Sequence, residues 1–393
     1  MAEPSSWFLD QLQVKESSPV LKFSIMGSDH SSKVLSWPSI KRDIENFKPT
    51  NISLSLTNIG GEYTTFYSSP EFLNSSCSLE VGFNHPVSGD ELIKVFTGIV
   101  KNVSYPDEKQ IQLQLYDKIH SLAQIKIGGS NRAVVFSETI PSEIMWTVCT
   151  CYGQFSSVRS TSNIDIDYAS FLQMAASFSA DTLLTNANFE NVKCTEALQD
   201  IANVTDSFIW SDGDGKVIFD RASENSSLDF LINEGEYINL KVSVDATSII
   251  NKQHVSYGYN EASDTWYQIS MANTTSINSF GLYENIFENE NVYFPSSIHA
   301  GVLANRMILK WGYPPRRFKI KTPLFGINRK LSETIRFVNS YWGVNSSTAW
   351  RIVNQEIDLD PENISIVFGT NEGTSGEAFY LDVSSLDGNH LLL

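Results

Sequence analysis

The sequence predicts a mainly β protein with a mixed α+β middle. Segments that alternate apolar and polar residues, as in 52–56, recur towards both ends of the chain, whereas the middle has apolar residues at helical spacing. Only 19% of the 393 residues are charged and 12% are aromatic, and Ser, Thr and Asn supply much of the polarity. Residues of these kinds favour strands and turns over helices.

The first part of the chain is predicted to be a β-rich domain that follows a short arm. A chain of 393 residues exceeds one ordinary core, so we expect several domains. Residues 1–16 are interpreted as a polar N-terminal arm that orders only against a partner. Residues 17–122 are predicted to form a barrel or sandwich. Its strands are expected at 20–25, 52–56, 77–83, 95–100, 103–105 and 111–117.

Residues 123–235 are predicted to form a small mixed α/β domain. Apolar residues at helical spacing predict helices over 142–152, 168–178 and 195–204, with Thr195 as a candidate N-cap. A β-hairpin is expected over 207–219, turning at Asp212-Gly-Asp-Gly.

Residues 236–372 are predicted to form a second β-rich domain with an insertion at about 269–312. The insertion reads as irregular over 269–291 and then as a helix over 298–311. Residues 373–393 are interpreted as a C-terminal extension that docks onto a neighbour. The strands of the domain are expected at 238–244, 252–259, 317–321, 334–338, 350–357 and 364–368.

Composition argues against several classes of protein. The formal net charge of −17 disfavours general binding to nucleic acid or anionic membranes, because phosphate groups bind clustered Lys and Arg. No stretch approaches the roughly 18 consecutive apolar residues of a membrane span, so no stable membrane insertion is expected. The first residues lack the pattern of a secretory signal. The four cysteines lack zinc-like spacing and are interpreted as reduced thiols of a protein made in the cytoplasm.

Motifs for catalysis or metal binding are weak. Asp212-Gly-Asp-Gly is similar to the start of a calcium loop but lacks the distal Glu, so a hairpin turn is favoured. Asp165 and Asp167 alternate as in an edge strand, and a carboxylate pair is what a glycan hydrolase needs. Two aspartates on one exposed strand face are usually only solvated. We therefore expect no catalytic, cofactor or metal site.

One charge asymmetry predicts an interface. Between Gly301 and Arg351 there are ten basic residues and one acidic residue, Glu333. Such a segment is either a solvated face or a surface that meets the acidic surface of a neighbouring copy, with a DNA-lining role as a third reading. The candidate interface residues are Arg316, Arg317, Lys319 and Lys321.

The order of three motifs resembles the central hub proteins of phage tails, which lie at the tail tip or baseplate. The motifs are Phe96-Thr97-Gly98-Ile99-Val100 with the strand 111–115, the segment 194–202 with the hairpin after it, and the segment 275–281 with the helix after it. The resemblance spans roughly 17–372. One departure occurs at Leu331-Ser332-Glu333-Thr334-Ile335, which lacks the glycine of the family's turn.

This resemblance implies two tube-like β-barrel domains, 17–122 and 236–372, around the mixed α/β domain. It implies a homotrimeric hub ring, a structural virion protein made in the bacterial host and not an enzyme. The ring would join the tail tube protein to distal tail or baseplate proteins and to spike or fibre proteins. Its channel would pass the tape-measure protein and DNA without sequence-specific binding. The alternative is a receptor- or carbohydrate-binding module whose aromatic residues between 342 and 350 stack on sugars.

Overall fold

A computed structural model gives the architecture of most of the chain. It describes residues 5–13, 18–45, 47–64, 72–87, 89–129, 132–221, 230–260 and 263–372. The expected C-terminal extension, 373–393, lies outside the described residues.

Seven strands form the first sheet, in the order β2-β1-β6-β7-β8-β5-β3. The strands predicted in this region are confirmed. Those expected at 95–100 and 103–105 belong to one long strand, β7, because bulges after Val100 and Ser104 bend it without ending its pairing with β8. The strands are β1 (Val20–Ile25), β2 (Ser28–Asp29), β3 (Val34–Ser36), β5 (Asn51–Thr57), β6 (Ser76–His85), β7 (Gly89–Asp107) and β8 (Gln110–Tyr116), with the 3₁₀ turn η1 (Ser31–Lys33).

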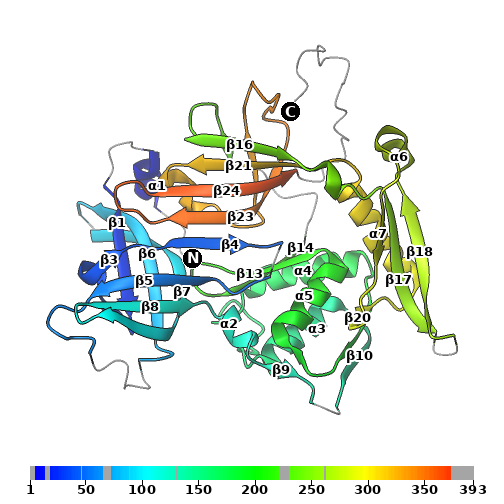
Figure 1. Cartoon of the computed structure of the whole chain (residues 1–393), viewed down its shortest axis with the longest axis horizontal. Coiled ribbons are helices and arrows are strands. Elements are labelled where there is room, and N and C mark those ends of the chain that lie inside the picture. Colours follow the sequence, from blue (N-terminus) through cyan, green and yellow to red (C-terminus); the bar gives the residue numbers. More distant parts are fainter. Residues whose placement is uncertain are drawn as a thin grey trace.

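The second sheet has the order β15-β22-β23-β24-β21-β16, and both sheets curl into half-barrels (Figure 1). The predicted strands are again confirmed, with β24 continuing to Glu372, but the strand predicted at 252–259 pairs in a different sheet, so the insertion begins earlier than expected. Inward side chains of both sheets, including Phe23, Leu79 and Phe318, belong to one apolar core. The elements are β15 (Leu231–Ile232), β16 (Asn239–Val244), β21 (Arg316–Thr322), β22 (Thr334–Phe337), β23 (Trp350–Asp358) and β24 (Ser365–Glu372), with η4 (Ala246–Ser248) and η5 (Leu324–Asn328).

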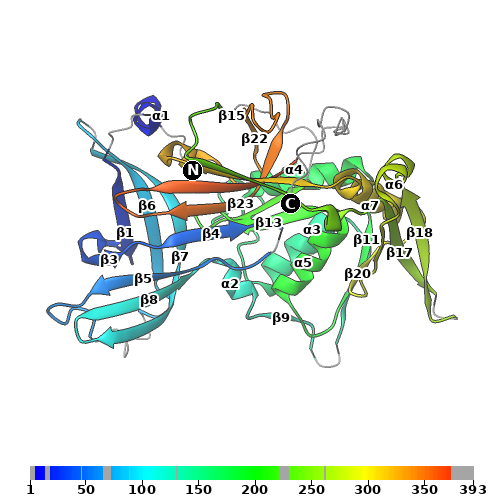
Figure 2. The same ribbon diagram turned by 45° about the horizontal axis from the view of Figure 1, so that its top comes forward.

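One strand from the first part of the chain belongs to the second sheet. β4 (Ser39–Asp43) lies within the range expected for the first domain, yet it pairs with β23, with Ile40 opposite Ile357. Figures 1 and 2 place it between β23 and β5, so the strands from β16 to β8 form one wall. Pairing between distant segments leaves no trace in local sequence, which is why alternation alone does not predict it.

The middle of the chain contains the mixed α/β part, which has its own core around Phe171, Leu198 and Val217. The three helices predicted here are confirmed, with two differences in detail. The first ends in a π-helical turn, and the third begins at Cys194 after the N-cap Lys193, so Thr195 is not the cap. The elements are α2 (Ile119–Leu122), β9 (Lys126–Ile127), β10 (Val134–Thr139), α3 (Pro141–Thr147), η3 (Val148–Tyr152), α4 (Tyr168–Ala180), β11 (Thr185–Phe189), β12 (Val192–Lys193), α5 (Cys194–Thr205), β13 (Ser207–Ser211) and β14 (Val217–Arg221).

The insertion is more regular than its Ser- and Asn-rich sequence suggests. A three-stranded sheet, β18-β17-β19, packs its Val255 side against α7. Asn273 caps a short helix, because its side chain accepts a hydrogen bond from the Ser276 N–H at 3.0 Å. The elements are β17 (Lys252–Asn260), β18 (Thr265–Ala272), α6 (Thr274–Phe280), β19 (Glu284–Phe287), β20 (Val292–Tyr293) and α7 (Ser297–Trp311).

The expected polar arm contains a helix, α1 (Ser6–Gln13). Phe8 and Leu12 of α1 are 1% and 7% exposed, and the Phe8 ring lies 5.4 Å from that of Phe83 on β6. A helix that buries such residues against its own chain needs no partner to become ordered. The sequence alone does not predict this helix, because its apolar residues extend over only one turn.

Candidate interaction surface on the second sheet

The four candidate interface residues lie on β21, between β24 and β16. Phe318 and Ile320 of this strand point into the core and are 1% and 0% exposed. Side chains alternate across a strand, so the odd-numbered residues project outward. The register places Lys241 of β16 beside Lys319. The outward basic residues Arg317, Lys319, Lys321 and Lys241 are called the basic strip below.

Arg316 and Arg317 are already engaged within the chain. Arg316 belongs to the inward face, where its guanidinium lies 5.3 Å from the ring centre of the buried Trp350. Arg317 reaches the Glu45 carboxylate at 3.6 Å. Across the described part of the chain, no carboxylate forms an ion pair with Lys319 or Lys321. These two lysines are therefore the best placed of the four to meet a partner, and that role stays a prediction.

Several other basic residues of the 301–351 segment bind carboxylates inside the molecule. Arg306 and Lys310 of α7 lie 3.4 and 3.0 Å from the Asp206 carboxylate at the end of α5. Burial opposes ionisation of Asp206, but the two cations outweigh it and hold the pKa of this carboxyl below its usual range. Arg351 reaches Asp220 at 3.8 Å. Some basic residues of the 301–351 segment therefore form ion pairs that join the mixed α/β part to the segments that follow it.

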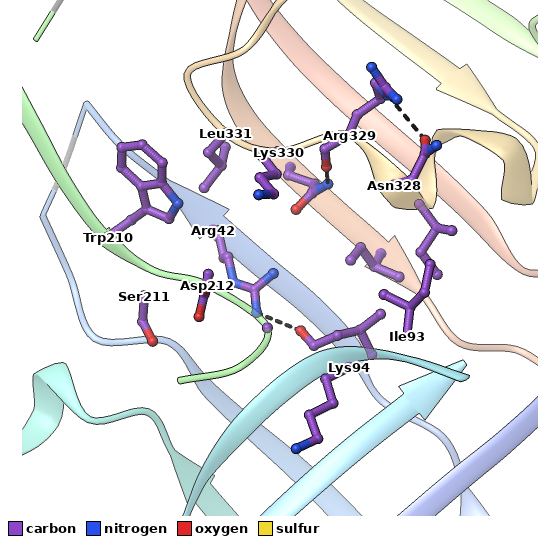
Figure 3. A pocket seen from close by; sticks show the side chains of 15 residues that line it. Arg42, Ile93, Lys94, Trp210, Ser211, Asp212, Asn328, Arg329, Lys330 and Leu331 are labelled. Atoms are coloured by element: carbon purple, nitrogen blue, oxygen red, sulfur yellow. Dashed lines mark hydrogen bonds between the residues drawn. The ribbon is translucent and has the colours of Figure 1, made fainter. Parts of the chain in front are cut away.

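A small pocket lies where both sheets meet the β13–β14 hairpin (Figure 3). Arg42 of β4 donates from Nη2 to the Val95 carbonyl of β7 at 2.5 Å, and its charge interacts with Asp117 and Asp212. The Arg42 Nε and the Ser211 Oγ are buried and have no hydrogen-bond partner among the described residues. The three parts of the molecule thus share one buried cluster of opposite charges.

Solved structures of phage tail proteins have the same arrangement along nearly their whole length. The 43 kDa tail protein of prophage MuSo2 from Shewanella oneidensis matches 91% of this chain and 99% of its own, with a TM-score of 0.58 and 15% identity. A tail protein from Neisseria meningitidis MC58 matches 91% and 98%, with a TM-score of 0.61 and 11% identity. The chain has the fold of phage tail proteins.

The tail-protein fold is also found in prophage tail protein gp18 from Listeria monocytogenes EGD-e. That structure matches 90% of this chain and 94% of its own, with a TM-score of 0.54 and 10% identity. No protein-family model matches the sequence, and no curated protein does. The likeness is therefore visible in the fold, where the mainly β class and the resemblance to phage tail proteins inferred from the sequence are confirmed.

Within this tail-protein fold, the motifs weighed for chemistry have structural roles. Asp212-Gly-Asp-Gly is the turn of the β13–β14 hairpin, with the Asp212 N–H donating to the Lys216 carbonyl. Residues 163–167 do not form the expected edge strand. Asp165 pairs with Lys118 at 2.5 Å, and Asp167 caps α4 by accepting from the Ala169 N–H. The two aspartates are thus held apart by different partners and do not form a carboxylate pair.

Sequence reasoning missed one polar constellation, on the outward face of the β18-β17-β19 sheet. The Ser270 hydroxyl lies 2.7 Å from Nδ1 of His254, whose Nε2 is 3.9 Å from Glu284. Glu284 also binds Lys252 at 2.5 Å. Ser270 lies within a paired strand, which offers no turn of free N–H groups to stabilise an oxyanion. The constellation links three strands, and only their register brings its members together.

The described residues contain no candidate for a metal site or for a membrane-spanning helix. These contain no group of three or more His, Cys, Asp or Glu side chains placed to hold a metal ion. None of the described helices has the length and apolar character needed to cross a membrane.

Proposed function

We propose that this chain is the central hub of a phage tail, a homotrimeric ring at the tail tip or baseplate. The ring joins the tail tube to the spike- or fibre-bearing tip and encloses the channel for the tape-measure protein and DNA. The virion is therefore its site of action.

One observation carries this proposal: a single chain contains two half-barrel sheets and matches tail proteins over almost its full length. Three such chains supply six half-barrels, which suits a junction between a threefold tip and a sixfold tube. Closed rings with cyclic symmetry are also the usual form of homo-oligomers.

The basic strip is proposed as part of the contact between copies or with the tube. Lys319, Lys321 and Lys241 lie side by side near the open edge strand β16, in a chain with a net charge of −17. An acidic neighbouring surface would attract this strip, set the register of the contact and increase the rate of association.

Light scattering on the purified chain, combined with negative-stain imaging, tests the hub. We expect a mass near three times the 44.0 kDa of one chain and a hollow threefold ring. The measurement is repeated with the tail tube protein present, because the tube is the natural template for the ring. A chain that stays monomeric under both conditions contradicts the proposal.

A receptor- or carbohydrate-binding module is the second candidate, and one loop favours it. Tyr341 is 82% exposed and Trp342 is 40% exposed, at the turn between β22 and β23. Trp350, by contrast, is fully buried and cannot stack on a sugar. Retention on host cell-wall glycans that is lost in Tyr341→Ala and Trp342→Ala would favour this function over the hub.

A further inference from the structure

The second sheet ends in a strand with one open edge. β16 pairs with β21 on one side, and no described strand pairs with its other side (Figure 1). The opposite end of the sheet is the two-residue strand β15, whereas β16 has six residues. A long open edge presents a row of N–H and C=O groups that can pair with another extended segment. The edge of β16 is therefore a place where a further strand can be added.

The side chains of β16 form an apolar row on one face and carry a charge on the other. Leu240 and Val242 are partly buried against the core that both sheets share. Ile238 and Val244 continue the same alternation and are 54% and 55% exposed. Lys241 is exposed on the opposite face, where it belongs to the basic strip. The shared core thus stops at β16 with its last apolar row only half covered, and covering this row would be favourable.

A segment with a matching pattern follows the last strand of the same sheet. Residues 373–393 come directly after β24 and lie outside the described residues. In their sequence, Phe379, Leu381 and Val383 alternate with other residues, as the apolar side of a strand does. The segment contains three acidic residues and neither Lys nor Arg. It is therefore complementary to β16 in both pattern and charge.

Pairing of the segment with β16 would satisfy both faces at once. In an antiparallel pair, Asp382 can lie opposite Lys241. The same register places Leu381 opposite Val242, so that the apolar side chains of the segment cover the apolar row and the carboxylate meets the basic strip. Resting on the proposed function, we propose that residues 378–383 of one copy add as a strand to β16 of the next copy in the ring.

The lengths of chain available favour a neighbouring copy over the same chain. β24 and β16 both pair antiparallel with β21, so both end on the side of the sheet where β21 begins. A strand added beyond β16 lies three strand spacings from β24, about 14 Å. Residues 373–377 span at most about 17 Å when fully extended, which leaves too little chain to reverse direction and pass η4. An exchange in which each copy gives one strand and receives one also closes within a ring.

Disulfide cross-linking of the assembled ring tests this pairing. The background is Cys151→Ser, because Cys151 is the exposed cysteine among the four. Ser243→Cys is combined with Tyr380→Cys, which lies opposite it in the register given above, and separately with Ala378→Cys or Asp382→Cys to allow for a slip of two residues. The Cα atoms of opposite residues lie about 4.5–5.5 Å apart, a distance that a disulfide spans. Ser243→Cys alone is the matched control and should stay monomeric on a denaturing gel after oxidation.

We expect the oxidised ring of at least one pair to give covalently joined chains, up to a closed trimer, on that gel. A disulfide within a single chain would mean that the segment pairs with its own β16. No cross-link in an intact ring of any of the three pairs would mean that the segment does not cover this edge. Each of these two results overturns the proposal while the ring itself stands. Absence of any ring, alone or with the tail tube, instead removes the proposed function and this proposal with it.

An exchange of charges tests the chemistry of the contact. Glu377→Lys with Asp382→Lys should lower the fraction of ring at low salt, because like charges then meet at the basic strip. Adding Lys241→Glu with Lys319→Glu to the same chain restores opposite charges and should recover the ring. An unchanged fraction of ring in the first variant, or no recovery in the second, would overturn the pairing of the segment with the strip.

Discussion

Asp117 follows the last strand of the first sheet and is buried near Arg42. Its Oδ2 accepts a hydrogen bond from the Thr50 N–H at 2.8 Å, while its Oδ1 has no partner in the part of the chain that the structure describes. Burial raises the pKa of Asp117 to about 6, although the Thr50 N–H and the Arg42 charge oppose the shift. The folded chain therefore binds this proton at a pH where the unfolded chain, with the usual pKa of 3.8, does not.

This difference makes Asp117 a source of pH-dependent stability. Because the folded pKa is the higher one, its contribution is largest below pH 4 and is lost as pH rises through about 6. Asp117→Asn does not titrate, so its stability relative to wild type should increase from pH 4 to pH 7, by on the order of 3 kcal/mol. Thermal unfolding of wild type and Asp117→Asn between pH 4 and pH 7 measures this difference in stability. The same pH dependence of stability in both proteins would contradict the prediction.

Ser332 occupies the position where the hub resemblance expects a glycine. Its φ of 69° is left-handed, which side chains other than glycine adopt at a cost. Its hydroxyl bonds to Asp220 and accepts from Arg351 Nη1 at 2.9 Å. These bonds between β14 and the second sheet offset the backbone strain.

Ser332→Ala should therefore be more harmful than Ser332→Gly. Both lose the hydroxyl, which we expect to cost about 1–2 kcal/mol, but glycine also relieves the left-handed strain. The measurement is the shift in melting temperature of each variant. Equal shifts would mean that the backbone at this position carries no strain.

At the scale of elements, the β13–β14 hairpin docks its turn against β7. The Gly213 carbonyl accepts from the Thr97 hydroxyl at 2.7 Å. A Cβ at Gly213 would lie 2.0 Å from the Lys94 carbonyl oxygen, so only glycine permits this approach. The turn thus fixes the mixed α/β part to the first sheet.

Gly213→Ala should push the hairpin away from β7. We expect a loss of about 1–3 kcal/mol of stability, because a backbone oxygen cannot move aside as a flexible side chain can. The matched control is Gly129→Ala, whose Cβ would meet no atom within 4 Å and whose φ is not left-handed. Thermal unfolding and limited proteolysis of the hairpin compare Gly213→Ala with Gly129→Ala. Equal stability and equal cleavage of the two variants would contradict a tight contact between the turn and β7.

Alternation in the sequence predicts most strands of the two sheets, because burying one face leaves a period of two. It does not reveal that β4 pairs with β23 or that Ser270, His254 and Glu284 meet, since both depend on register between separate strands. The count of basic residues points to β21, whose role as an interface stays a prediction. The count does not show that Lys319 faces outward whereas Arg316 packs on Trp350.

At the scale of the whole molecule, charged residues are found in two settings. Asp206 with Arg306 and Lys310 joins α5 to α7, and these pairs are partly buried. The basic strip instead faces outward, where salt screens charges more strongly. Added salt should therefore weaken contacts between copies before it weakens the fold.

Charge reversal on the strip tests its role in assembly. Lys319→Glu with Lys321→Glu should lower the fraction of trimer and the rate of ring formation, with little change in melting temperature, because neither lysine has an internal ion pair among the described residues. Lys109→Glu with Lys126→Glu makes the same charge change at exposed positions elsewhere and should assemble normally. Analytical ultracentrifugation at low and high salt measures the assembly of both double variants. Identical assembly of the two would exclude a role of the basic strip in the contact between copies.

The path of β4 sets when the protein can finish folding during its synthesis. Ser39 on this strand bonds to Glu356, 317 residues later. At about 5–20 residues per second, a ribosome needs on the order of tens of seconds to make the chain between them. Until β23 emerges, β4 lacks its partner, and long-range closure of this kind is slow. Completion of the wall therefore waits until β23 has been made, so a product that terminates before β23 leaves β4 with an open strand edge.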